Sequence, residues 1–117
     1  FFREKEKECL EFLIDHQDIV IATGGGMPCS DNAIELMIEL GETVYLEAEV
    51  STLISRLWNE QFGRPMVPNI GTKEDLNEFI SKHLSEREEY YKKCKHIVCV
   101  DGKSVEEISK EIKHVLL

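Results

Sequence analysis

The stretch that decides the fold is DIVIATGGGMPC, residues 18–29, in which three consecutive glycines follow a short apolar run. An apolar run of this length, at 18–23, is typical of a strand covered on both faces, as in a parallel sheet. Glycine permits positive φ and lets a ligand or another backbone approach the main chain closely. Gly24, Gly25 and Gly26 therefore indicate either a turn whose N–H groups bind a ligand or a tight strand-to-helix turn without one.

Strand and helix patterns alternate on both sides of this turn. Two further short apolar runs predict strands at 43–48 and 96–100. Segments with apolar residues at helical spacing occupy 2–14, 30–41, 50–57, 73–93 and 105–116. This alternation predicts one domain over residues 1–117, an α/β fold with three α/β/α layers and a parallel sheet. Ligands of such sheets bind beyond the carboxyl ends of the strands, where the triple glycine lies.

Composition argues against several classes of function. The formal charge of −9 disfavours nucleic acid or an anionic membrane as partner, and no apolar run approaches the length of a membrane span. The four cysteines form no CxxC pair, and the four histidines show no ligand spacing. We therefore expect free thiols, no metal ligands that can be named, and a cytoplasmic location.

The four arginines are the candidate anion-binding residues. The planar guanidinium group can bind a carboxylate or a phosphate through two hydrogen bonds, which suits it to this role better than lysine. Arg87 falls in the apolar stripe of its helix, in step with Leu76, Ile80, Leu84 and Tyr91. A guanidinium that points inward needs a partner. That partner is either an intramolecular carboxylate or a bound anion.

The other three arginines have weaker local signals. Arg3 lies one helical turn before Glu6, which is placed to orient it or to form a terminal ion pair with it. Arg64 precedes Pro65 in the irregular loop 62–72, which fits either a mobile lid over a phosphate or an ordinary exposed loop. Arg56 lies on a predicted helix, where an arginine is usually a surface residue.

Taken in order, FRxxE at 2–6, IATGGG at 21–26, GRP at 63–65 and RxxxY at 87–91 resemble the shikimate kinase family. That family belongs to the adenylate-kinase-like branch of the P-loop kinases, and the resemblance covers essentially the whole chain. It implies ATP-dependent phosphorylation of the shikimate 3-hydroxyl to shikimate 3-phosphate, on the route to chorismate and the aromatic amino acids. Mg²⁺ is implied by the same chemistry.

The resemblance also implies roles for the residues that bind shikimate. Arg3 and Arg87 would hold its carboxylate, with Glu6 supporting Arg3. The glycine triplet, chiefly Gly25, would donate backbone N–H groups to the substrate.

The remaining roles concern the nucleotide. Arg64 would come down with the lid loop 62–72 onto the ATP phosphates and act catalytically on the transferring phosphoryl group. Arg56 would flank the nucleotide.

Two elements of the family do not occur in these 117 residues: the GxxxxGK[ST] loop with its strand, and an Asp-x-Asp segment. The resemblance therefore corresponds to the C-terminal two thirds of such an enzyme, and we expect the 117 residues alone not to catalyse. In the family the P-loop strand lies between the strands that match 19–23 and 43–48. The expected partner is thus an N-terminal segment of the same protein, or another chain, that completes the sheet.

Two alternatives remain at this stage. One is a related small-molecule kinase, such as a gluconate kinase, since gluconate also carries a carboxylate. The other is a non-catalytic module that binds shikimate and regulates.

Overall fold

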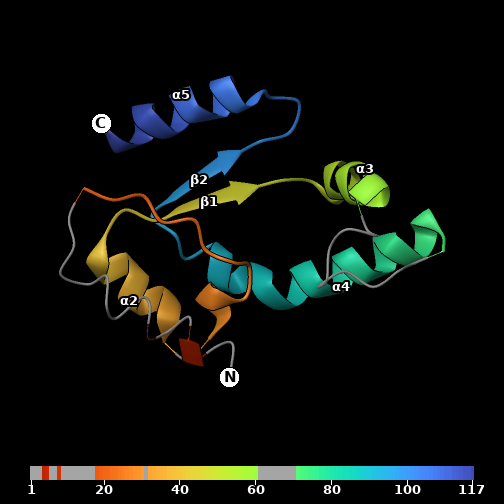
Figure 1. Ribbon diagram of the computed structural model, residues 1–117, viewed down its shortest axis with the longest axis horizontal. Coiled ribbons are helices and arrows are strands. Elements are labelled where there is room, and N and C mark those ends of the chain that lie inside the picture. Colours follow the sequence, from red (N-terminus) through yellow and green to blue (C-terminus); the bar gives the residue numbers. More distant parts are fainter. Residues whose placement is uncertain (1–3, 6–7, 9–17, 31, 61–70) are drawn as a thin grey trace.

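The computed structural model describes residues 4–5, 8, 18–30, 32–60 and 71–117 of the chain (Figure 1). Most of the expected helix at 2–14 and most of the loop 62–72 lie outside these residues. In chain order the elements are the short 3-10 helix η2 (Met27–Cys29), α2 (Ala33–Leu40), β1 (Val44–Glu47), α3 (Val50–Glu60), α4 (Lys73–Tyr91), β2 (His96–Cys99) and α5 (Val105–Leu116).

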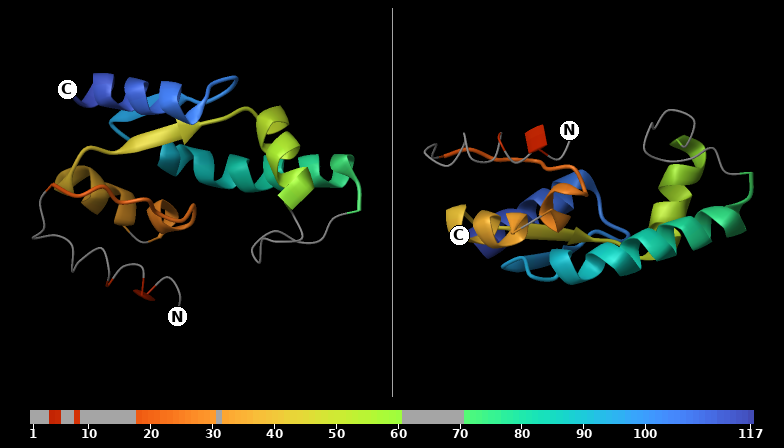
Figure 2. Two further views of the ribbon diagram at one scale, coloured as in Figure 1. Left: turned by 45° about the horizontal axis from the view of Figure 1, so that its top comes forward. Right: turned by 90° about the horizontal axis from the view of Figure 1, so that it is seen from below.

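The sheet of the described residues has two parallel strands, with Val44 of β1 opposite His96 and Glu47 opposite Cys99 of β2. Parallel strands require a crossover connection, and the chain between β1 and β2 supplies α3 and α4. Figures 1 and 2 show α5 on one side of the strands, with α2 and α4 on the other. This arrangement agrees with the predicted α/β/α layers.

The segment expected to be the first strand differs from its prediction. Residues 19–24 pair with no strand within the described part of the chain, and Val20 is fully exposed at 100%. A strand needs a neighbour to accept its backbone hydrogen bonds. The apolar pattern at 18–23 indicates strand propensity, but no described segment occupies the position beside it.

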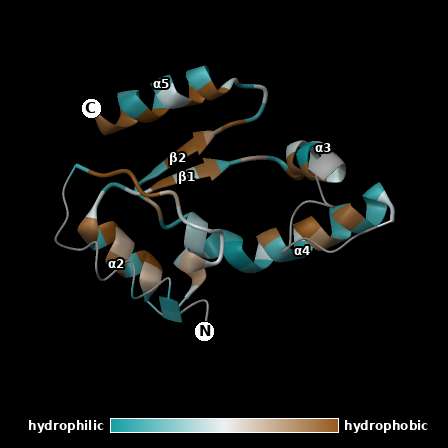
Figure 3. Cartoon of the chain, in the orientation of Figure 1, coloured by the Kyte–Doolittle hydropathy of each residue, from teal (hydrophilic) through white to brown (hydrophobic). Residues whose placement is uncertain are grey.

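The core joins α2, α4 and β2. Its buried apolar residues are Met27, Ala33, Ile34, Leu76, Ile80, Val98 and Val100. Figure 3 shows both strands in hydrophobic colours, with further hydrophobic turns on α2, α4 and α5. Leu76 and Ile80 lie on the predicted apolar stripe of α4, so the inward face of that helix is confirmed.

Local sequence fixes where two helices begin. The Thr72 side chain accepts a hydrogen bond from the Asp75 N–H at 3.1 Å, which caps α4. Ser104 and Glu107 form a reciprocal capping box at the start of α5. Across the described ranges, no helix combines the length and apolar character that spanning a membrane would require.

Candidate functional site

The triple glycine forms a turn that leads into η2. The Met27 N–H donates to the Gly24 carbonyl at 3.3 Å, and Pro28 lies in the first turn of the short helix. Gly26 has a φ of −87°, and among the described glycines only Gly102 has positive φ. The left-handed backbone that glycine permits is therefore not what this turn requires of the triplet.

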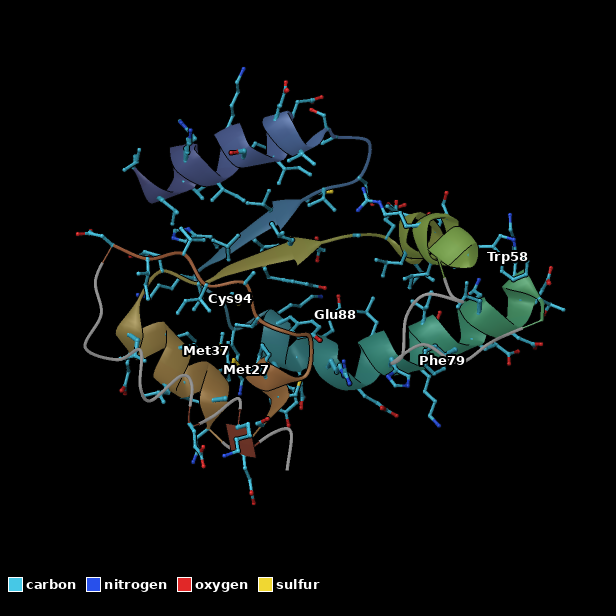
Figure 4. All side chains as sticks on the ribbon, viewed as in Figure 1. Met27, Met37, Trp58, Phe79, Glu88 and Cys94 are labelled. Atoms are coloured by element: carbon cyan, nitrogen blue, oxygen red, sulfur yellow. The ribbon has the colours of Figure 1, made fainter. Side chains whose placement is uncertain are left out.

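Close approach explains the glycine at position 25. A Cβ atom there would lie 3.1 Å from the Tyr91 hydroxyl oxygen and 3.4 Å from Nη1 of Arg87. The Tyr91 hydroxyl donates a hydrogen bond to the Gly25 carbonyl at 2.5 Å. A side chain at position 25 would thus compete with the C-terminal turns of α4, which lie against η2 (Figure 4).

Arg87 is brought to this turn by its place on α4. Its side chain is half-buried, and none of the ion pairs formed between described residues includes it. The adjacent Glu88 instead pairs with Lys92 at 3.3 Å. The structure therefore provides Arg87 with a neighbouring phenol and the Gly25 backbone, whereas the alternative of an intramolecular carboxylate partner finds no support in these ranges.

Two tyrosines complete the cluster. The ring of Tyr45 on β1 packs against Tyr91 with centroids 5.2 Å apart. Burial, followed by the charges of Glu88 and Glu47, raises the pKa of Tyr45 to about 12. Burial also raises the pKa of Tyr91, and a side-chain hydrogen bond with Arg87 opposes that rise. Both phenols therefore keep their protons at neutral pH.

Sequence reasoning did not assign a role to either tyrosine. Tyr91 stood only in the apolar stripe and in the motif with Arg87, and its hydroxyl contact crosses 66 residues. The spacing of four residues from Arg87 was the one signal that could have indicated it. Nothing in the local pattern around Tyr45 pointed to the glycine turn.

A second polar cluster lies at the carboxyl end of β2. The two carboxylate oxygens of Asp101 accept from the Glu49 N–H at 3.0 and 3.1 Å, where α3 begins. Hydrogen bonds from the Thr52 side chain and from the Glu49 backbone lower the pKa of Asp101. Arg56 contributes a weaker charge interaction and is exposed on α3.

The structure thus brings together only some of the predicted site residues. The glycine turn and Arg87 meet, whereas Arg56 lies on α3, which Figures 1 and 2 place away from η2. Arg3, Glu6 and Arg64 lie outside the described residues. Their roles stay predictions.

Known proteins match this chain along its whole length. The family model for shikimate kinase matches residues 1–117. Curated shikimate kinases of Flavobacterium psychrophilum and Flavobacterium johnsoniae are 37% and 36% identical over 118 residues, which is 99% of this chain and 68% of each relative. A crystal structure of shikimate kinase from Bacteroides thetaiotaomicron is similar with a TM-score of 0.83 at 29% identity, over 97% of this chain and 65% of that one.

The chain therefore spans about two thirds of the length of these relatives. The matches confirm the predicted family, the α/β fold class and the class of phosphotransferase, and they do not favour the gluconate-type or regulatory alternatives. The fold, the glycine turn with its neighbouring arginine, and these relatives agree: the chain belongs to the shikimate kinase family.

Proposed function

We propose that this chain provides the acid-binding part of an enzyme that phosphorylates the 3-hydroxyl of shikimate with ATP. The observation that carries the proposal is the position of Arg87, a half-buried guanidinium beside Gly25 that pairs with no described carboxylate. A planar guanidinium can bind a carboxylate through two parallel hydrogen bonds. A small cyclic acid of this kind would supply the partner that the described part of the chain does not.

The glycine turn offers backbone N–H groups as hydrogen-bond donors beside Arg87. No hydrogen bond formed among the described residues uses the Gly25 N–H as donor. Gly24 and Gly25 are exposed and Gly26 is buried, so the backbone of the turn borders the surface beside α4. We expect the triplet to donate to substrate oxygens while Arg87 holds the carboxylate.

Holding the acid at one end has a catalytic purpose. Phosphoryl transfer requires little covalent chemistry from the protein and depends on placing the attacking hydroxyl in line with the phosphate. A carboxylate fixed by Arg87 orients the ring of shikimate, and its 3-hydroxyl then faces the nucleotide. In this proposal Arg3, supported by Glu6, is the second cation on the carboxylate.

The nucleotide side of the reaction lies largely beyond the described residues. Arg64, in the lid loop 62–72, is proposed to neutralise charge on the transferring phosphoryl group, and Arg56 to flank the nucleotide. The sequence contains no GxxxxGK[ST] loop. We therefore expect the 117 residues alone to show no steady-state turnover, with the phosphate cradle supplied by an N-terminal segment or another chain.

Mg²⁺ is expected from the chemistry of ATP, but the described residues provide no ligand set that can be named for it. Among the residues that the structure describes, no three His, Cys, Asp or Glu side chains form a group that could hold a metal ion. No step through Mg²⁺ is assigned to these residues. Cys94 and Cys99 are free thiols, which supports the proposed cytoplasmic location.

A coupled assay of ADP release tests the function in an enzyme that contains this chain together with a P-loop segment. We expect turnover with shikimate and none above background with gluconate at the same concentration. Comparable turnover with gluconate, or ADP release that does not depend on the acid, would contradict the proposal. The same assay on the 117 residues alone tests whether the P-loop segment is required.

A further inference from the structure

We propose that Tyr91 is a positioning residue for the acid site, because its hydroxyl fixes both the Gly25 turn and the guanidinium of Arg87. This inference rests on the proposed function of that site. In this inference a neutral side chain, Tyr91, orients Arg87 and the glycine turn for binding a carboxylate.

The first step concerns the glycine turn. The preceding segment 19–24 forms no strand pairing within the described ranges, and Gly25 is exposed. The Tyr91 hydroxyl reaches its carbonyl at 2.5 Å, while the Cys29 sulfur lies 3.9 Å from the same oxygen and is a weak donor. The hydrogen bond from the Tyr91 hydroxyl is therefore the stronger of the two contacts to the Gly25 carbonyl, and it connects this turn to α4. Since a peptide unit is planar, fixing the Gly25 carbonyl also fixes the N–H of Gly26.

The second step concerns Arg87. Arg87 and Tyr91 are four residues apart on α4, so their side chains share one face of the helix. A phenol oxygen can donate one hydrogen bond and still accept others, and Tyr91 donates to Gly25 while interacting with Arg87. This contact uses only part of the guanidinium and leaves its charge unneutralised. A carboxylate in the same position would orient Arg87 but would also compete with the substrate.

The third step is that Tyr91 is itself held in place. Its ring packs on Tyr45 of β1, and its side chain is half-buried. The sheet, the end of α4 and the glycine turn are thereby joined through one phenol. Removing only the hydroxyl should leave the ring packing intact and release both polar contacts.

Tyr91→Phe in the active enzyme tests the inference. We expect the KM for shikimate to rise about 5- to 30-fold, the range of one lost hydrogen bond near a charged group, with the KM for ATP changing less than about twofold. Tyr90→Phe is the matched control. Its ring faces the Lys93 ammonium at 5.5 Å, and its hydroxyl forms no hydrogen bond with a described residue. We expect that variant to keep both KM values.

A second measurement separates positioning from general damage. Shikimate methyl ester lacks the carboxylate charge, so Tyr91→Phe should reduce the preference for shikimate over its ester by a similar factor. If Tyr91→Phe lowers the Tm strongly, an isosteric fluorinated tyrosine at position 91 replaces it. Its more acidic phenol loses the donor proton as pH rises, and the KM for shikimate should then rise with pH more steeply than in the unmodified enzyme.

Equal rises in both KM values, or an unchanged KM for shikimate with an unchanged ester preference, would overturn the positioning role. Failure of the proposed function has a different signature, because the unsubstituted enzyme would then not phosphorylate shikimate at all. Loss of shikimate affinity in Arg87→Ala together with an unaffected Tyr91→Phe would overturn only the inference about Tyr91.

Discussion

Two polar clusters of this chain use their charge in opposite ways. In the Asp101 cluster, formed by Glu49, Thr52 and Asp101, the carboxylate is engaged by hydrogen bonds from α3. In the glycine cluster, formed by Gly25, Tyr91 and Arg87, the charged group meets a carbonyl and a phenol and no described carboxylate. The difference teaches that a charge engaged within the chain stabilises the fold, whereas a charge oriented by neutral groups remains available to a ligand.

The largest effect on substrate binding is expected when the charged residue of the glycine cluster is removed. Arg87→Ala removes the fork that would bind the carboxylate, so we expect the KM for shikimate to rise about 100-fold and the KM for ATP far less. Steady-state kinetics with each substrate varied in turn measure this split. Arg87→Lys keeps the charge without the fork and should recover only part of the loss.

Lys92→Ala is the matched control for Arg87→Ala. Lys92 is an exposed cation on the turn that ends the same helix, and among the described residues its only ion pair is with Glu88 at 3.3 Å. Its kinetics should equal those of the unsubstituted enzyme. Equal effects of Arg87→Ala on both substrates would count against a carboxylate clamp.

The next effect tests close approach in the same cluster. Gly25→Ala places a methyl group 3.1 Å from the Tyr91 hydroxyl oxygen, so that hydroxyl must shift by a few tenths of an ångström. We expect the KM for shikimate to rise about 10-fold, because the hydrogen bond that fixes the turn is weakened. Gly41→Ala is the control, because no atom of the described part of the chain lies within 4 Å of its added methyl group. A wild-type KM for Gly25→Ala would show that the contact has no bearing on binding.

The Asp101 cluster should respond in stability instead of affinity. Asp101→Asn removes the charge of the carboxylate whose two oxygens share the Glu49 N–H, and we expect the Tm to fall by a few degrees with the KM for shikimate unchanged. Thermal unfolding followed by circular dichroism measures the change. A raised KM for shikimate would erase the contrast between the two clusters.

The pH dependence of the Asp101 contribution follows from its sign. The pKa of Asp101 is lowered in the folded chain, chiefly by the Thr52 hydrogen bond, relative to about 4 in the unfolded chain. The ionised form is therefore favoured by folding. Its stabilisation is complete above the unfolded pKa and is lost as pH falls through the folded one. Asp101→Asn should accordingly lose part of the fall in Tm seen on acidification below about pH 4.

The smallest effect on activity is expected at a site in neither cluster. Ser104→Ala removes the capping box of α5 and should lower the free energy of unfolding by about 1 kcal/mol. The KM values for both substrates should remain as they are. Urea unfolding measures the loss, and a change in KM would show that α5 communicates with the acid site.

The sequence predicted those features that depend on local periodicity. The inward face of α4, with Arg87 on it, followed from residue spacing, whereas the approach of Arg87 to the glycine turn was implied only by the resemblance to the shikimate kinase family. Tyr91 packs as an apolar residue would, so spacing could not reveal that its hydroxyl donates to Gly25 across the chain. Asp101 was missed for a related reason, because it accepts from the N–H of Glu49, which lies 52 residues earlier, just before α3.

The segment 18–23 marks the other limit of sequence reasoning. Its apolar pattern indicates the conformation that the residues prefer, but a strand also needs a neighbour for its backbone hydrogen bonds. No neighbouring strand is present for this segment among the described residues, and Val20 is fully exposed. Propensity is a local property, whereas pairing depends on which other segment occupies the adjacent position.

One last consequence follows from the fastening of α4 at both ends. Thr72 caps its start, Leu76 and Ile80 anchor its first half, and Tyr91 secures its final turn. At 1.5 Å per residue, Lys73 and Arg87 are held about 21 Å apart, as on a rigid spacer. Because Leu76 and Ile80 are buried in the core, we expect them to resist displacements that begin upstream of Thr72 before these change the geometry around Arg87.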